Sequence, residues 1–464
     1  PLVPSEHVAG TVYLGGNHLM RSRDRGATWE EASPDLTRQI DRDTIPVMGQ
    51  LVDENTLSQH DGVGEYGTIT AIEESPVSES LIYVGTDDGN LQVTIDGGAT
   101  WTNVVGNLEG LPARSYVSRI DASHEVEGRV YASFDGHLDG DYRPFVYVSE
   151  DFGASWREIT SGLPPWSVNV VREHPSSPDL LFVGNEIGVY VSIDRGGSWH
   201  RMSGIPTVPV DDLLIHPRDN DLVVGTHGRS IWILDDVSPL EDMARGGVLE
   251  RNAYLFGVPT GTQWFLHEDW PFWGDAYEAE NPPNGVAVRY WLSEEIDEAP
   301  SIRITTATGQ TVRELEGSAD AGLQSVVWDL RETAPEIEGA LEDEDWTPPQ
   351  GALVMPGIYL AHIDVGNDSF EQDIRVRLDP GVEGDTRNLR ARNAAARSVV
   401  AVTALGQAAQ GSLGRVEEQI TAALELLEST DAASELVTEA EAIGERLDSL
   451  RSDLGAAVPG RLLG

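Results

Sequence analysis

The sequence lacks both cysteine and lysine, so arginine supplies all 31 of its basic side chains. The absence of cysteine excludes disulfide bonds and thiolate metal sites, and it leaves the cellular compartment undecided. No apolar run approaches the roughly 20 residues that a membrane-spanning helix needs, so we predict no membrane insertion. No residue pattern indicates a cofactor, and we predict none.

Acidic residues outnumber basic residues by 78 to 31, which gives the 464-residue chain a net charge of −47. A surface of this sign repels nucleic acids and anionic membranes, so we predict no nucleic-acid partner. Acidity on this scale is typical of a well-hydrated surface in a salty or metal-rich habitat. It therefore favours a neutral or cationic ligand but identifies no particular acidic site.

One eight-residue phrase, Ser/Thr-x-Asp-x-Gly-x-Ser/Thr-Trp, occurs four times, at residues 22–29, 94–101, 149–156 and 192–199. In such a phrase the Asp accepts backbone N–H groups within a turn, and the Gly can adopt a positive φ. The Trp then opens the next strand with a large apolar face. The four aspartates are therefore predicted to be structural: Asp24, Asp96, Asp151 and Asp194.

Each copy of the phrase accompanies two alternating apolar runs joined by a turn, and the later copies have one more strand candidate upstream. Together with the strand after each Trp, this predicts four strands per unit, as in a propeller blade. A fifth unit, at 222–236, keeps the hairpin without the phrase, as terminal repeats often do.

The first unit begins with a middle strand at 11–16. We therefore expect it to lack an innermost strand and to expose a strand edge. About five blade units do not comfortably close a ring. They predict the C-terminal part of a larger propeller, completed by an upstream propeller portion or by a second chain.

The repeated phrase resembles the Asp-box, or bacterial neuraminidase repeat, of β-propeller proteins. Residues 10–240, and most clearly the closing unit at 206–236, resemble the large bacterial proteins with sortilin-type or xyloglucanase-type Asp-box propellers that are often labelled glycosyl hydrolase-like. The resemblance implies a multidomain protein that is secreted or periplasmic, although the chain shows no signal peptide. The arginine triad, Tyr/Glu pair and Phe-Arg-Ile-Pro phrase of Asp-box sialidases are not visible, so it implies no sialidase activity.

The predicted fold class is mainly β, with four segments along the chain. They are a partial propeller in 1–240, a connecting segment in 241–283, an immunoglobulin-like (Ig-like) β-sandwich in 284–380 and a helical hairpin or three-helix segment in 381–464. About six short alternating strands favour the sandwich, and its phrases Val-Val-Trp-Asp-Leu-Arg and Pro-Gly-Ile-Tyr resemble the Ig-like module of flagellar hook-cap proteins. Helical periodicity in the last segment predicts three apolar stripes, of which the first runs through Leu389, Ala395, Val399, Val402 and Leu405. The predicted role of these helices is a docking or capping element, with a partner coiled coil as the alternative.

A propeller carries its Asp-boxes on one rim, and we call this the Asp-box rim. The hairpin turns and the links between blades lie on the opposite rim, the hairpin rim, where ligands usually bind. The predicted ligand-binding residues on the hairpin rim are Asp87, Asp88, His137, Asp139, Glu186, Asp211, His227 and Arg229. A structural role remains open for each, because Asp favours hairpin turns and a turn histidine often bonds to backbone. The acidic phrase at 135–141 lacks the spacing of an EF-hand loop, so we predict no metal.

Two interpretations remain open for Arg119, Asp121 and Arg172, which fall on innermost strands. They line a central channel, or they form an ion-pair girdle that holds the blades together.

Carboxylates beside aromatic rings on the hairpin rim suit carbohydrate binding. The predicted function is a noncatalytic binding or scaffold propeller that recognises a glycan or a peptide. The alternative is a glycoside hydrolase that acts on a polysaccharide with two rim carboxylates. Spacing singles out no acid pair, so the sequence leaves open whether the protein is an enzyme.

Overall fold

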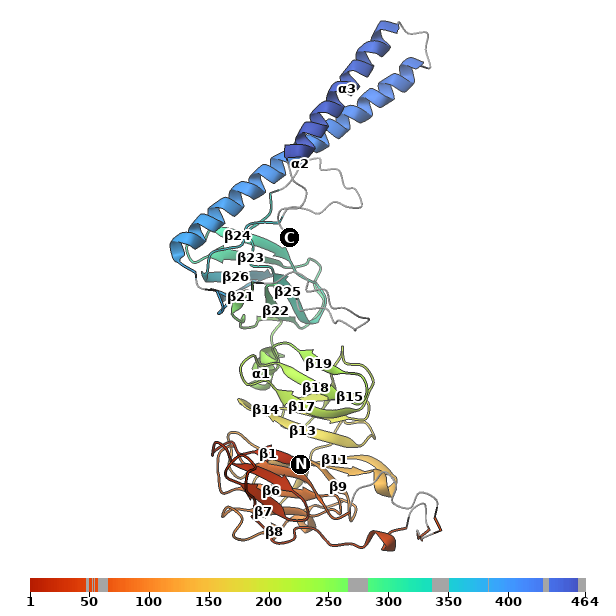
Figure 1. The fold of residues 1–464 in the computed structure, drawn as a ribbon, viewed down its shortest axis with the longest axis vertical. Helices are drawn as coiled ribbons and strands as arrows, with labels where there is room; N and C mark the ends of the chain where they lie inside the picture. Colours follow the sequence, from red (N-terminus) through yellow and green to blue (C-terminus); the bar gives the residue numbers. More distant parts are fainter. Residues whose placement is uncertain are drawn as a thin grey trace. The chain divides into compact units, whose positions relative to one another are not determined.

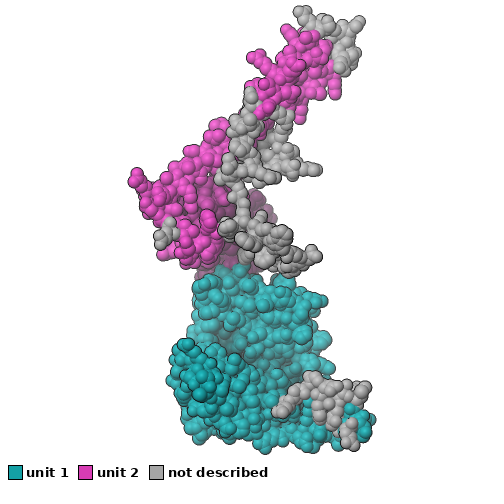
Figure 2. All heavy atoms as spheres, in the orientation of Figure 1, with its two compact units in different colours: residues 1–247 teal, residues 248–464 magenta. Residues whose placement is uncertain are grey.

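The computed structural model describes residues 1–46, 50–51, 53, 55–56, 66–265, 283–335, 350–382, 384–428 and 434–457. Two compact units meet at residue 247 in the chain and are coloured separately in Figure 2. Unit 1 comprises residues 1–247, and unit 2 comprises residues 248–464. Part of the predicted connecting segment, residues 266–282, lies outside the described residues.

Unit 1 consists of five small antiparallel sheets that follow one another along the chain (Figure 1). We call these sheets blades 1 to 5, since their strands pair in chain order as in a propeller. Blade 1 has β1 (Leu2–Pro4), β2 (Val12–Gly15), β3 (Leu19–Ser22) and β4 (Glu30–Glu31), and blade 2 has β5 (Ile69–Glu74), β6 (Ile82–Thr86), β7 (Leu91–Thr94) and β8 (Thr102–Asn103).

The last three blades complete unit 1. Blade 3 has β9 (Tyr116–Ala122), β10 (Val130–Gly136), β11 (Asp141–Ser149) and β12 (Arg157–Glu158), and blade 4 has β13 (Val168–His174), β14 (Ser177–Asn185), β15 (Gly188–Ser192) and β16 (His200–Arg201). Blade 5 has β17 (Val210–Ile215), β18 (Leu222–Thr226) and β19 (Ile231–Leu234), and helix α1 (Ser238–Ala244) follows it. Short 3-10 helices occupy Arg42–Thr44, Val105–Asn107 and His137–Asp139.

The prediction that blade 1 lacks an innermost strand is wrong. Strand β1 pairs with β2, with Leu2 opposite Leu14. This strand is only three residues long, and it contains Pro4, which cannot donate a backbone hydrogen bond. The sequence therefore shows no alternating pattern from which the strand could be predicted. The incomplete sheet is blade 5, which within residues 210–247 has three strands. The exposed edge therefore lies on β19, whose four residues are all exposed.

Each Asp-box is a turn stabilised by its own side chains. In the second copy, Asp96 accepts the Thr100 N–H at 2.8 Å and the Thr100 hydroxyl at 2.6 Å, and the Thr94 hydroxyl oxygen accepts the Gly98 N–H at 2.9 Å. Gly97 and Gly98 adopt positive φ angles of 70° and 99°. The two bonds from Thr100 lower the pKa of Asp96 to about 2. The other three copies repeat this pattern.

Adjacent blades pack face to face. At three of the junctions, a glycine on the second strand of one blade leaves room for a side chain of the next blade. A Cβ atom on this glycine would collide with a β-branched side chain near the start of the next innermost strand. The distances are 2.7 Å from Gly15 to Ile69 Cγ2, 2.3 Å from Gly85 to Val117 Cγ1, and 2.6 Å from Gly184 to Val210 Cγ1. The repeated glycine is therefore a requirement of blade packing rather than of backbone conformation.

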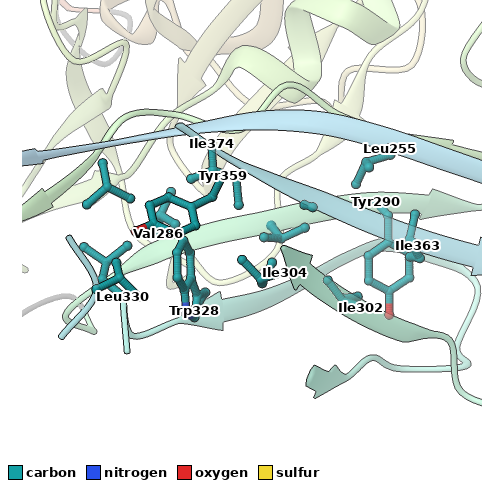
Figure 3. Packing of buried hydrophobic residues seen from close by; sticks show 14 of the residues in the cluster. Leu255, Val286, Tyr290, Ile302, Ile304, Trp328, Leu330, Tyr359, Ile363 and Ile374 are labelled. Carbon is teal, nitrogen blue, oxygen red and sulfur yellow. The ribbon is translucent and has the colours of Figure 1, made fainter. Parts of the chain in front are cut away.

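Unit 2 contains two sheets that enclose one apolar core. One sheet has the order β20 (Ala253–Leu255), β22 (Val286–Leu292), β25 (Gly322–Trp328). The other has the order β21 (Gly261–Gln263), β27 (Asp368–Leu378), β26 (Gly357–Val365), β23 (Ser301–Thr306), β24 (Thr311–Glu316). Figure 3 shows Trp328 against Tyr359 in this core, with ring centroids 5.4 Å apart. Two sheets around a shared core form a β-sandwich.

Two long helices end the described chain, α2 (Thr386–Glu428) and α3 (Ser434–Ala457). Val399, Val402 and Leu405 of the first predicted stripe on α2 are exposed. Buried positions on the first half of α2 include Asn393, which donates to the Leu353 carbonyl, and Val400. Contacts with the sandwich determine that this face of α2 is the buried one. The helical periodicity of the sequence carries no information about those contacts. No helix in the described residues is long and apolar enough to cross a membrane.

Candidate functional site

The hairpin rim of unit 1 holds the predicted ligand-binding residues, at the turns between second and third strands and at the links between blades. Asp87 and Asp88 follow β6, His137 and Asp139 lie between β10 and β11, Glu186 follows β14, Asp211 is the second residue of β17, and His227 and Arg229 follow β18. These residues differ in their hydrogen bonds and in their exposure to solvent. Some are bonded within the protein and have a structural role, whereas others are exposed and accessible to a ligand.

The acids of blade 2 are engaged within the protein. Asp87 Oδ1 accepts the N–H groups of Gly67 at 3.0 Å and Thr68 at 2.8 Å, and burial raises the pKa of this carboxyl. Asp88 is fully buried and accepts the Arg38 N–H at 2.6 Å. Both carboxylates thus join the link between blades 1 and 2 to the β6–β7 turn.

Blade 3 presents a cluster of polar and aromatic groups at the surface. His137 Nδ1 lies 2.5 Å from Asp135 Oδ1, and its ring meets Tyr142 edge to face with centroids 4.9 Å apart. Asp139 pairs with Arg114 at 2.8 Å. These side chains keep part of their surface exposed, so a ligand on the rim can reach them.

Blade 5 contributes an open acidic group, and blade 4 contributes a half-buried one. Asn169 Nδ2 donates to Glu186 Oε1 at 3.1 Å and also to the Val210 carbonyl at 3.3 Å, so it connects the two blades. Asp211 Oδ2 lies 3.3 Å from His227 Nδ1, and these side chains are 55% and 78% exposed. An exposed carboxylate next to an exposed imidazole can both accept and donate hydrogen bonds.

Asp211 departs from a hydrogen-bond pattern that blades 2 to 4 share. Thr70, Ser118 and Asn169 each donate to a backbone carbonyl of the next blade, at 2.8, 2.8 and 3.3 Å. Blade 5 has Asp211 at the corresponding position of its innermost strand, and an ionised carboxylate cannot donate. Its oxygens are therefore available to a donor from outside the blade stack.

Aromatic and cationic groups flank these acids on the rim. Trp166, in the link between blades 3 and 4, is an exposed large ring. Burial, together with the charges of Asp87 and Asp135, raises the pKa of Tyr116 on the neighbouring innermost strand. Arg229 donates to the adjacent Gly228 carbonyl from an exposed turn. Rings beside carboxylates offer a sugar both a stacking surface and hydrogen-bond acceptors.

Charged side chains of the innermost strands meet across blades 2 to 5. Arg172 pairs with Asp121 at 2.7 Å, and Arg119 pairs with Asp212 at 3.0 Å. Glu73 accepts the N–H of the residue after Asp121 at 3.3 Å. The sequence left two interpretations open, a lined channel and an ion-pair girdle. These contacts between blades are those of an ion-pair girdle. Sequence reasoning missed Glu73 and Asp212, although Glu73, Asp121 and Arg172 stand at one position of the aligned strands.

The girdle predicts a pH dependence of stability. Burial and the neighbouring Asp121 raise the pKa of Glu73 from 4.5 to about 8. Because the folded state holds this proton more tightly than the unfolded chain does, the carboxyl stabilises the fold below pH 4.5 and loses this contribution as the pH rises through 8. Glutamine is neutral at every pH, so the Glu73→Gln variant does not lose this contribution. Its free energy of unfolding relative to wild type should therefore be about 1–2 kcal/mol higher at pH about 8 than at pH about 4. Urea denaturation at both pH values measures the gain, and an equal difference at the two would contradict it.

A cavity of about 480 Å³ lies on the Asp-box rim between blades 1 and 2, lined in part by Thr11, Tyr13, Arg21 and Arg23. Both arginines donate to Glu30 Oε1, at 2.8 and 3.2 Å, so one carboxylate is shared by two guanidinium groups. Sequence reasoning placed no site here, because loops of two separate blades build it. None of the residues predicted to bind a ligand lines this cavity.

No protein-family model matches the chain, and no curated protein matches it either. Among solved structures it is similar to a GH74 xyloglucanase from Xanthomonas campestris, with 17% identity over 82% of this chain and 52% of that one, at a TM-score of 0.38. The chain thus spans about half the length of that protein. YCF48 from Cyanidioschyzon merolae shares 11% identity over 49% of this chain and 66% of that one, at a TM-score of 0.33.

An auxiliary nutrient binding protein from Bacteroides thetaiotaomicron shares 17% identity over 36% of this chain and 38% of that one, at a TM-score of 0.29. Similarities at these identities concern the fold alone. The small antiparallel sheets of unit 1 are the part of this chain that has a propeller-like arrangement.

Proposed function

We propose that unit 1 is a noncatalytic binding propeller, which recognises a neutral or cationic glycan or peptide on its hairpin rim. The observation that carries the proposal is the exposed Asp211–His227 pair beside Glu186. Asp87 and Asp88 belong to the predicted site as the groups that hold its turns in place. The remaining predicted contacts come from His137, Asp139 and Arg229.

Titration of the full chain with three probes tests this proposal: neutral β-glucan oligosaccharides, an arginine-rich peptide and heparin. We expect binding of one of the first two and none of heparin, because the net charge of −47 repels polyanions. Glu186→Gln and His227→Ala should each weaken that binding about 10-fold, the loss of roughly one hydrogen bond to a charged group. Isothermal titration calorimetry measures the change, and circular dichroism verifies the fold.

The matched control is Glu127→Gln, which makes the same charge change in the exposed β9–β10 loop on the Asp-box rim. This variant should bind as wild type does. Tight heparin binding would contradict the proposal. Equal loss in the control and in Glu186→Gln would show a general charge effect instead of a site.

The second candidate function is a glycoside hydrolase. Glu186 and Asp211 come from adjacent blades, and Asn169 hydrogen-bonds both the first carboxylate and the backbone next to the second. Such a pair could protonate a leaving group and activate water. Release of reducing sugar from β-glucans, lost in both Glu186→Gln and Asp211→Asn, would favour hydrolysis. Binding without release would favour the noncatalytic function.

We also propose the context of this propeller. An upstream propeller portion or a second chain would complete its ring, and the protein would be secreted or periplasmic. The sandwich of unit 2 would be an Ig-like module at about 284–380, between a connecting segment at 241–283 and a helical segment at 381–464. Unit 2 would then serve as a spacer for the binding propeller.

A further inference from the structure

The cavity of about 480 Å³ between blades 1 and 2 lies where blade 1 carries a smaller side chain than the blades that follow it. Thr11, which lines the cavity, stands one residue before the position that pairs with the first Ser or Thr of the Asp-box. The same position of blades 2, 3 and 4 is occupied by Leu81, Arg129 and Leu180, and all three are buried. Threonine therefore leaves space that a longer side chain fills in the other blades.

Arg21 is a second departure of blade 1 from the other blades. It stands opposite Tyr13, on the face of blade 1 that packs against blade 2. The residue opposite the aromatic ring of the second strand is Val93 in blade 2, Val148 in blade 3 and Val191 in blade 4. Val93 and Val148 are buried in cores shared with the next blade. A guanidinium group thus stands where the other blades have an apolar side chain.

Arg23 adds a second guanidinium group to the lining of the cavity. Arg21 Nε and Arg23 Nε donate to the same oxygen of Glu30, and this carboxylate is half exposed. Among the described residues, the Nη atoms of Arg23 have no hydrogen-bond partner. The N–H groups of a guanidinium match the two oxygens of a carboxylate. Two arginines that share one internal carboxylate can therefore bind a second carboxylate from outside.

Other groups of the lining suit the rest of a small ligand. Glu79 and Ser80 line the cavity and are exposed, so they can form hydrogen bonds with hydroxyl groups of a ligand. The buried Thr11 hydroxyl has no hydrogen-bond partner among the described residues, so the protein itself gives this side chain no polar role. The volume of the cavity falls within the range of about 300–1,000 Å³ that is typical of small-molecule sites.

We propose that this cavity binds a small hydroxy-carboxylate, that is, a molecule with one carboxylate group and a hydroxylated body. Arg21 and Arg23 bind the carboxylate, and Glu79 and Ser80 bind hydroxyl groups of the body. The net charge of −47 disfavours ligands with several negative charges, so the ligand carries only one. This site lies on the Asp-box rim and takes an anion, whereas the binding function proposed above concerns neutral or cationic ligands on the hairpin rim.

Saturation-transfer NMR of the full chain tests the proposal with glucuronate and glucose. These two sugars differ only in the carboxylate, which replaces a CH₂OH group. We expect glucuronate to bind with a Kd on the order of 1 mM and glucose to bind at least about 10-fold more weakly. Inorganic phosphate, added as a competitor, should displace glucuronate less effectively than acetate does, because the second negative charge of phosphate is repelled.

Two variants give this junction the residues of the other blades. Thr11→Leu should fill the cavity, and Arg21→Val should remove one guanidinium group; each should weaken glucuronate binding about 10-fold or more. Both variants should fold, because blade 2 packs against blade 3 with Leu81 and Val93 at these positions, and circular dichroism verifies this. Thr11→Leu should leave binding on the hairpin rim unchanged, so the failure of one proposal can be told from the failure of the other.

Arg23→Met and Arg25→Met form a matched pair for the loss of one positive charge. Both arginines belong to the same Asp-box, but Arg25 lies outside the described lining of the cavity. We expect Arg23→Met to weaken glucuronate binding about 10-fold and Arg25→Met to bind as wild type does. The proposal is overturned if glucuronate does not bind, if glucose binds equally well, or if phosphate displaces glucuronate better than acetate. Equal losses in Arg23→Met and Arg25→Met would overturn it as well.

Discussion

Replacement of Gly85 with alanine is expected to lower the free energy of unfolding by about 3 kcal/mol. The added Cβ would lie 2.3 Å from Val117 Cγ1 and 2.5 Å from Val117 Cβ, and Val117 is fully buried at the start of blade 3. A β-branched residue has few rotamers with which to retreat, so the two blades must separate. Urea denaturation of the full chain, followed by the fluorescence of its tryptophans, measures the loss.

Gly225→Ala is the matched control for this prediction. It makes the same change at the corresponding strand position, where the nearest atom lies at 3.6 Å, in ordinary contact. We expect a change within about 0.5 kcal/mol. A loss at Gly225 as large as at Gly85 would mean that these glycines serve the backbone, and the packing explanation would then be wrong.

Arg172→Met is expected to destabilise unit 1 by about 3 kcal/mol at neutral pH. Methionine keeps most of the side-chain length but removes the charge that lies 2.7 Å from Asp121 and 3.5 Å from Asp212. The buried Asp121 carboxylate then loses its ion pair with Arg172. It also remains close to Glu73, whose pKa its charge raises. The loss should therefore shrink below pH about 4, where carboxylates take up protons.

Arg143→Met is the control for the loss of an ion pair as such. Arg143 pairs with Asp141 at 2.6 Å but is 64% exposed, and surface pairs of this kind contribute about 0–1 kcal/mol. Denaturation of both variants at two pH values separates the cases. A loss in Arg172→Met that does not depend on pH would show that packing, not charge, is the role of this side chain.

The parts of the fold that could be predicted from the sequence are those whose interactions are local. The hydrogen bonds of the Asp and Ser/Thr side chains within an Asp-box join residues at most four positions apart, so the phrase alone predicts the turn. The innermost strand of blade 1 was missed because a three-residue strand with Pro4 has no periodicity to detect. The sequence could not tell which face of α2 is buried, because contacts such as that of Asn393 with Leu353, 40 residues away, determine that face.

The candidate site shows the same division. The sequence placed eight residues on one rim because repeat geometry assigns each turn to a rim. It could not tell that Asp87 and Asp88 are engaged by residues 67–68 and 38, whereas Asp211 and His227 face solvent. The partners of the first two are contributed by an inter-blade link, whose path no local pattern determines.

The sequence by itself determined the repeat, the turn chemistry of its Asp-boxes, the acidic surface and the predominance of β structure. Composition and interactions within about eight residues are enough for these properties. The tertiary structure alone decided which charges meet along the innermost strands and which rim groups remain open. Those features depend on side chains that lie tens of residues apart in the sequence and become neighbours only when the blades stack.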